Sequence, residues 1–309
     1  MASKPHRQPK GGRDLTICIA GIHDKQPSRV IIACFDRRLT TMGGIHSSDG
    51  TAWKMKTVRK NWWALLSGKT SDLTAMGYAF EEGLKDAVPE IFIDFARYCV
   101  GIYKVERRKL VETEVLSDYD VNSYEEYLSL KASDRDFYDA IEAKVKDFDQ
   151  GLNVLMCGFE RDSIPHIFVI SGPGNLAFCD AQGYGVIGTG AWAAQFSLDR
   201  QPYDKWKRLG ECIFAVLAAK FTAEAAEGVG PDSVLFVLDP EWNKLQALLK
   251  EPALAGYKEK WKALPRIPDG IVDDLENSLN IHDMVTRMRS SHAEAYTMPS
   301  DSETSEDQQ

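Results

Sequence analysis

The stretch LTICIAGIHDKQPSRVIIACFD, residues 15–36, decides the fold class of this 309-residue chain. Two β-branched apolar runs flank the polar turn HDKQPS, a pattern typical of a β-hairpin. Both runs are apolar almost without interruption, which predicts strands covered on both faces. A second strand pair follows in WKMKTVRKNWWALLSG, residues 53–68, with its turn at Lys60 and Asn61.

The remaining elements occur in groups. Helical spacing begins at TSDLTAMGYAFEEGLKDA, residues 70–87, and another helix is expected after Pro89. Strand patterns return in LNVLMCGF, HIFVISG, NLAFCD and GYGVIGTG, followed by one or two helices and the strand VLFVLDP. Grouped strands and grouped helices favour an α+β layered architecture over a doubly wound parallel sheet.

Composition divides the chain into three parts. Residues 1–14 are interpreted as a flexible basic leader, and residues 15–240 as one domain with an acidic, tyrosine-rich helical insertion at about 117–150. Residues 241–309 are interpreted as a helical extension with a disordered acidic tail, SDSETSEDQQ. Within that extension we expect two helices, around Lys244–Lys250 and Tyr257–Ala263.

Charge and residue usage exclude several classes of protein. A net charge of −9 argues against nucleic-acid binding, and no apolar run approaches the ~18 residues of a membrane span. The leader lacks the apolar core of a secretory signal, so we expect a cytoplasmic location. The six cysteines show no CxxC pairs and are predicted to be buried reduced thiols. The six histidines show no metal-binding spacing, and we expect neither a metal nor another cofactor.

Several segments, taken in order, resemble proteasome β-type subunits, which are N-terminal-nucleophile hydrolases. They are a threonine at the first strand, ACFDRRLTTMGG, WKMKTV, LLSGKTSD and a late IGTG, and the likeness covers roughly residues 15–240. It is strongest to short bacterial members, in which threonine directly follows the initiator methionine. The resemblance implies a four-layer αββα sandwich of two mainly antiparallel sheets between helical layers. It also implies peptide substrates and a homo-oligomer.

The resemblance also assigns roles to individual residues. Thr16 takes the place of the nucleophile, Asp36 and Lys54 lie beside it, and the Gly68 amide points at the oxyanion. Further positions are implied in the same way: Arg38 beside Asp36, Thr189, Glu224 and Glu227 near the catalytic amine, and Thr40 on the segment that pairs with an extended substrate.

The chemistry implied for Thr16 needs a free α-amine. A threonine hydroxyl is a poor nucleophile without a base, and in this class the base is the residue's own amine, with an unperturbed pKa of roughly 7.7–8.0. Lys54 would lower the pKa of that amine, whereas the carboxylates of Glu224 or Glu227 would raise it.

Simpler interpretations stay open for the same residues. Asp36 could be a strand-end residue paired with an adjacent arginine, and Lys54 could lie with Lys56 on a solvated strand face. SGKTSD lacks the first glycine of a phosphate-binding loop, so nucleotide binding is set aside. A register slip of one residue would put Ile17 in the nucleophile's place.

The bond between Leu15 and Thr16 leaves two hypotheses for function. While Leu15 is attached, the nitrogen of Thr16 is an amide with no basic lone pair. The first hypothesis is a threonine peptidase or amidase that is latent until residues 1–15 are removed, unless the start codon itself lies at Leu15. The alternative is a noncatalytic proteasome-like subunit that acts in assembly or ligand binding.

Overall fold

The computed structural model describes residues 16–25, 28–36, 39–41, 44–46, 54–86, 88–148, 151–226, 229–240, 247–249 and 253–264. By its internal contacts the chain divides after Glu259. The architecture and the candidate site described below belong to the part that precedes this division.

The first sheet is built around the predicted hairpin and has the strand order β10-β1-β2-β11-β12. All of its neighbouring strands are antiparallel. Its strands are β1 (Ile17–Lys25), β2 (Ser28–Asp36), β10 (Tyr184–Gly188), β11 (Ser233–Leu238) and β12 (Ala247–Leu249). Residues 17–23 of β1 and 30–36 of β2 are buried without interruption, which confirms that these strands are covered on both faces.

The second sheet has the order β5-β6-β7-β8-β9 and is also antiparallel throughout. Its strands are β5 (Met55–Arg59), β6 (Trp62–Ser67), β7 (Asn153–Phe159), β8 (Pro165–Ser171) and β9 (Asn175–Phe178). The predicted turn at Lys60 and Asn61 joins β5 to β6, and Asn61 adopts the positive φ of 62° that such turns favour. A separate hairpin pairs β3 (Leu39–Thr41) with β4 (Gly44–His46).

Helices flank the sheets. The α-helices in the described residues are α2 (Thr70–Gly83), α3 (Phe92–Glu114), α4 (Tyr124–Ser133), α5 (Arg135–Asp147), α6 (Ala191–Arg200), α7 (Leu209–Ala223) and α8 (Ala253–Lys262). Two short 3₁₀ helices, η1 (Leu116–Tyr119) and η2 (Arg161–Ser163), complete the list. None of the helices in the described residues is long and apolar enough to span a membrane.

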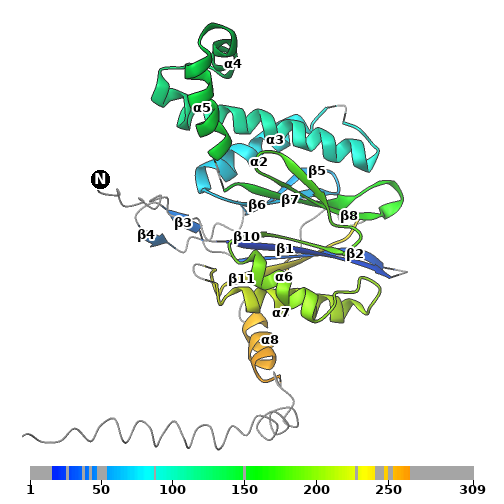
Figure 1. Cartoon of the computed structure of the whole chain (residues 1–309). Coiled ribbons are helices and arrows are strands. Elements are labelled where there is room, and N and C mark those ends of the chain that lie inside the picture. The colour runs from blue at the N-terminus through cyan, green and yellow to red at the C-terminus, as the bar shows by residue number, and fades with distance from the viewer. Residues whose placement is uncertain are drawn as a thin grey trace, which may run out of the picture. The chain divides into compact units, whose positions relative to one another are not determined.

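The period of two along β6 explains how one strand packs into two cores. Trp62, Ala64 and Leu66 face one core with residues of α2 and α3, whereas Trp63 and Leu65 face the other with residues of β1 and β2. The second core therefore lies between the two sheets. On the outer side of the first sheet, α7 contacts β1 and β2, and α6 contacts β10 (Figure 1).

A separate apolar cluster forms beyond the sheets, where α4 and α5 pack near the end of α3 (Figure 1). It contains aliphatic residues and tyrosines from α3, η1, α4, α5 and the segments between them: Val111, Val115, Leu116, Val121, Tyr127, Tyr138, Ile141 and Val145. This cluster explains why the tyrosine-rich stretch predicted to hold short helices forms an ordered structure despite its acidity.

The mixed α+β class with two antiparallel sheets is confirmed, but one element after Pro240 is not. Residues 247–249, for which a helix was predicted, form β12 and extend the first sheet by pairing with β11. An edge strand offers unpaired backbone groups, so strand pairing can override a weak local helix preference. The second predicted helix of this segment corresponds to α8, which begins at Ala253.

Candidate active site

The start of β1 and the end of β2 lie side by side because the two strands form an antiparallel hairpin. Thr16 directly precedes β1, and Asp36 is the last residue of β2. Lys54 directly precedes β5, so its side chain reaches Asp36 from the second sheet. The structure thus brings together the three residues that the sequence placed at the centre of the site.

The carboxylate of Asp36 accepts hydrogen bonds from four residues. Its Oδ1 accepts from Thr16 Oγ1 at 2.7 Å, from the Ile17 amide at 3.0 Å and from Lys54 Nζ at 2.7 Å. Its Oδ2 accepts from the amide of Gly230 at 3.2 Å. We call Thr16, Asp36, Lys54 and Gly230 the Thr16 cluster.

The side chains of Thr16, Asp36 and Lys54 are almost completely removed from solvent. Thr16, Asp36 and Lys54 are 3%, 0% and 2% exposed. A buried carboxylate is tolerated only where donors and an opposite charge compensate for its lost hydration, and Asp36 has both. The interpretation of Lys54 as a solvated strand residue is therefore wrong, whereas Lys56 is partly exposed and pairs with Glu81.

Gly188 allows the backbone to approach Thr16 closely. It pairs with Ile17 across the first sheet and has a φ of 104°, which disfavours any residue with a side chain. A Cβ atom at this position would lie 2.2 Å from the carbonyl oxygen of Thr16. The first glycine of the IGTG segment is thus required by geometry, and the predicted Thr189 follows it directly and is partly buried.

Gly68 is the first residue of the turn between β6 and α2. Its φ is 148°, and a Cβ there would lie 3.1 Å from Cα of Leu152. Close by in the chain, the Leu66 carbonyl accepts a contact from Cys18 Sγ at 3.6 Å, which ties this end of β6 to β1. The end of β6 that leads into Gly68 therefore lies next to β1, and the orientation of the Gly68 amide towards an oxyanion stays a prediction.

Sequence reasoning missed two residues next to this site. Gly230 donates to Asp36, and its carbonyl accepts from Nζ of Lys220 at 2.9 Å. The same ammonium donates to Glu224 Oε1 at 2.6 Å, and the other oxygen of Glu224 pairs with Lys258. The predicted Glu224 thus has both carboxylate oxygens paired with lysines. The available signal for Lys220 was a single charge within the apolar run AVLAAKFTA of α7.

The remaining predicted positions are only partly described. Arg38 and Glu227 lie outside the described residues. Thr40 lies in β3 opposite Ile45 of β4, and its side chain is outside the description. Their roles stay predictions.

Cysteine is not a competing nucleophile near Thr16. All six thiols are buried and unpaired, as the sequence predicted. Burial raises the pKa of the Cys18 thiol far above its ordinary value, and the charge of Lys54 opposes this only in part. Burial likewise raises the pKa of Cys34 to about 12. Among the described residues, no group of histidine, cysteine and carboxylate side chains could hold a metal ion.

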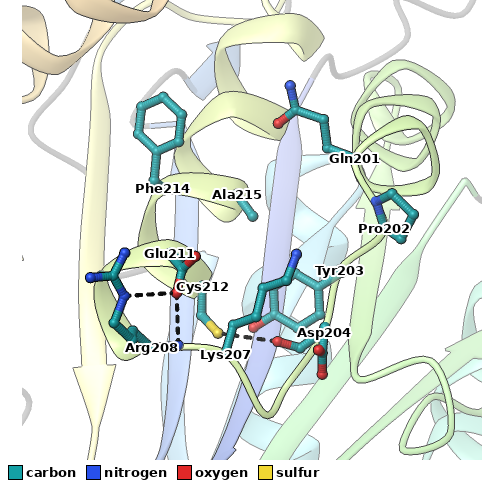
Figure 2. A pocket seen from close by; sticks show the side chains of 11 residues that line it. Gln201, Pro202, Tyr203, Asp204, Lys207, Arg208, Glu211, Cys212, Phe214 and Ala215 are labelled. Atoms are coloured by element: carbon teal, nitrogen blue, oxygen red, sulfur yellow. Dashed lines mark hydrogen bonds and ion pairs between the residues drawn. The ribbon is translucent and has the colours of Figure 1, made fainter.

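A cavity of about 600 Å³ lies away from the Thr16 cluster, between the segment after α6 and the start of α7 (Figure 2). Tyr203, which lines it, donates to the Ile22 carbonyl near the other end of β1. Ile22 lies six positions beyond Thr16 along the extended strand, a separation of roughly 20 Å. Burial raises the pKa of Cys212 in this cavity, which disfavours a reactive thiolate. The cavity is no part of the Thr16 cluster.

The sequence matches no family model and no curated protein. Its structure does match a solved one, a mutant of Anbu from Hyphomicrobium sp. strain MC1. The TM-score is 0.54 at 15% sequence identity, over 86% of this chain and 96% of the other. This chain has a proteasome-like fold. At this identity the likeness establishes the fold, and the chemistry must be argued from the Thr16 cluster.

Proposed function

We propose that this chain is a proteasome-like threonine peptidase or amidase, with Thr16 as nucleophile once residues 1–15 have been removed. The observation that carries the proposal is the convergence of Thr16 Oγ1 and Lys54 Nζ on one buried oxygen of Asp36, each at 2.7 Å. A hydroxyl, a lysine and a carboxylate at one end of a buried sheet form the set that N-terminal-threonine catalysis uses.

In this proposal the fold is the four-layer αββα sandwich of N-terminal-nucleophile hydrolases. The core between the two sheets and the packing of α2, α3, α6 and α7 against the sheets support it. Such a sandwich brings the ends of strands from both sheets together, which is how Lys54 of the second sheet reaches Asp36 of the first.

The proposed reaction begins at the freed amine of Thr16. The amine takes the hydroxyl proton, and Oγ1 attacks the carbonyl carbon of the substrate. The Gly68 amide donates to the resulting oxyanion, a contribution of about 3–4 kcal/mol in comparable sites. The amine then gives its proton to the leaving nitrogen, the C–N bond breaks, and water hydrolyses the ester on Thr16.

Lys54 and Asp36 prepare this step without reacting themselves. The ammonium of Lys54 disfavours protonation of a neighbouring amine, so more of that amine is present as the base. Asp36 holds the hydroxyl of Thr16 and the ammonium of Lys54 on one oxygen and thereby fixes their separation.

The proposed substrate is a peptide that adds to the protein as an extended strand. Main-chain hydrogen bonds then supply affinity, and pockets select side chains. The segment that contains Thr40 takes this place in our proposal, in a cytoplasmic homo-oligomer without a nucleic-acid or membrane partner.

One observation favours the noncatalytic alternative. Thr16 is only 3% exposed, and in the intact chain its nitrogen is an amide, so this form has neither a base nor an accessible hydroxyl. A chain that keeps residues 1–15 would use the buried cluster only to hold its sheets together and would act in assembly or ligand binding.

Mutation of Thr16 in a chain that begins at this residue separates the two functions. We expect hydrolysis of some members of a fluorogenic peptide library, loss of that hydrolysis in Thr16→Ala, and retention of part of it in Thr16→Ser, which keeps the hydroxyl. Folding is monitored by circular dichroism. Equal hydrolysis by Thr16→Ala and the parent chain would refute the proposed nucleophile, and a folded parent with no activity would favour the noncatalytic function.

A further inference from the structure

Lys220 is a lysine where an apolar residue is the ordinary choice. It is 0% exposed, and its neighbours Leu217, Ala218, Ala219 and Phe221 on α7 are buried as well. An ammonium in such surroundings is costly unless it is paired and hydrogen-bonded. The Glu224 Oε1 atom and the Gly230 carbonyl supply that compensation, at 2.6 and 2.9 Å from its Nζ.

Both backbone polar groups of Gly230 form hydrogen bonds. Its carbonyl accepts from Lys220, and its amide donates to Asp36 Oδ2 at 3.2 Å. Glycine has the greatest backbone freedom of any residue, although the following Pro231 restricts it. The bond from Lys220 therefore reduces the freedom of the peptide group that orients the carboxylate of Asp36.

The orientation of the Asp36 carboxylate matters because its other oxygen, Oδ1, accepts hydrogen bonds from Thr16 and Lys54. If the Gly230 amide moves, the carboxylate can rotate about its terminal torsion, which has a broad energy minimum. Rotation would shift Oδ1 relative to both Thr16 Oγ1 and Lys54 Nζ. Small displacements of reacting groups have large effects on rate.

We propose that Lys220 is a positioning residue of the candidate active site, which acts through Gly230 and Asp36 on Thr16. The catalytic part of this inference rests on the proposed function. Lys220 is fully buried and bonds to Gly230, so it sets the geometry of the site without touching the substrate.

Lys258 provides a matched control. It pairs with the other oxygen of Glu224, its side chain is 24% exposed, and within the described part of the chain the bond to the Gly230 carbonyl comes from Lys220. Lys258→Met and Lys220→Met each remove one ammonium from the same carboxylate, and each leaves Glu224 with one lysine. Only Lys220→Met removes the bond to the Gly230 carbonyl.

The test uses chains that begin at Thr16, with two readouts. The first is kcat and KM for a fluorogenic peptide, with the active sites counted by covalent titration so that a loss of folded protein does not enter kcat. We expect Lys220→Met to lower kcat by about tenfold or more, equivalent to about 1.4 kcal/mol. We expect its KM, and both constants of Lys258→Met, to stay within about twofold of the parent values.

The second readout does not depend on activity. Hydrogen exchange of the amides in residues 229–232, followed by mass spectrometry, reports on the bond between Gly230 and Asp36. We expect faster exchange in Lys220→Met and in Asp36→Asn, and parent-like exchange in Lys258→Met.

The two readouts distinguish a failure of the proposed function from a failure of the inference about Lys220. A parent chain without hydrolytic activity would refute the proposed function, and the exchange rates alone would then decide whether Lys220 holds Gly230 on Asp36. Parent-like exchange in Lys220→Met would overturn the inference. So would an unchanged kcat in an active enzyme.

Discussion

The buried pair of Asp36 and Lys54 should be the most strongly coupled ion pair near the site. Its atoms are 2.7 Å apart, which at an effective dielectric constant of about 20 gives an attraction of about 6 kcal/mol before the cost of desolvation is subtracted. Asp36→Asn leaves Lys54 buried without its counter-charge, and Lys54→Met leaves Asp36 with neutral donors only. We expect each change to lower the free energy of unfolding by about 3–5 kcal/mol.

The double variant should cost far less than the sum of the two single variants, because it removes both buried charges together. We expect a coupling energy of about 3 kcal/mol from the double-mutant cycle. Urea unfolding, followed by tryptophan fluorescence, gives the four free energies that the cycle needs.

A more exposed ion pair, formed by a lysine two residues beyond Lys54, serves as the control. Nζ of Lys56 in β5 and Oε2 of Glu81 in α2 are 2.6 Å apart, but the side chains are 23% and 42% exposed, so solvent screening should make their coupling far weaker than that of Asp36 and Lys54. A coupling between Asp36 and Lys54 no larger than that of the control pair would refute the argument that this buried pair organises the site.

Three further predictions concern the surroundings of the site. In urea unfolding, Gly188→Ala should lower the free energy of unfolding by about 2–4 kcal/mol, because its Cβ would overlap Thr16. The control is Gly210→Ala in α7, whose Cβ would meet nothing within 4 Å and which should be neutral or slightly stabilising. Burial, aided by Lys25 and opposed by Asp24, lowers the pKa of His23 below its ordinary 6.5. As pH falls, the unfolded chain therefore binds the proton before the folded one, and the stability contributed by His23 is lost as pH falls below about 6.5. The difference in unfolding free energy between the parent and His23→Asn should shrink from pH 7.5 to pH 5.5. A constant difference would contradict this. The six buried thiols should react with a thiol reagent only after unfolding, and rapid labelling of the native protein would contradict their burial.

Local sequence patterns were sufficient for the strands of the two sheets other than β12. The runs in residues 15–36 and 53–68 carry continuous apolar character and turn residues, and both became hairpins. The strand at residues 247–249 was not predicted, because its pairing with β11 at the edge of the first sheet overrides the weak local helix preference of this segment. Trp192 and Phe196 of α6 are 69% and 61% exposed, so its apolar residues do not mark one buried face, and no range was assigned to that helix from the sequence.

The candidate site, like the fold, was predicted from the sequence only in part. Thr16, Asp36 and Lys54 were found because their motifs resemble a known family in order, and the structure places their side chains in contact. Gly230 acts through its backbone amide, which no side-chain pattern reveals. In the sequence Lys220 is a single charge within a helix. Its hydrogen bonds to Glu224 and to the Gly230 carbonyl become evident only once α7 is packed beside the segment that precedes β11.

The most direct test of Thr16 as an N-terminal nucleophile compares two chains that differ by one residue. One begins at Thr16 and the other at Leu15, and all downstream contacts of the Thr16 cluster are available to both. We predict peptide hydrolysis only by the chain that begins at Thr16, because only this chain has a basic nitrogen on the threonine. Equal hydrolysis by the two chains would contradict the account.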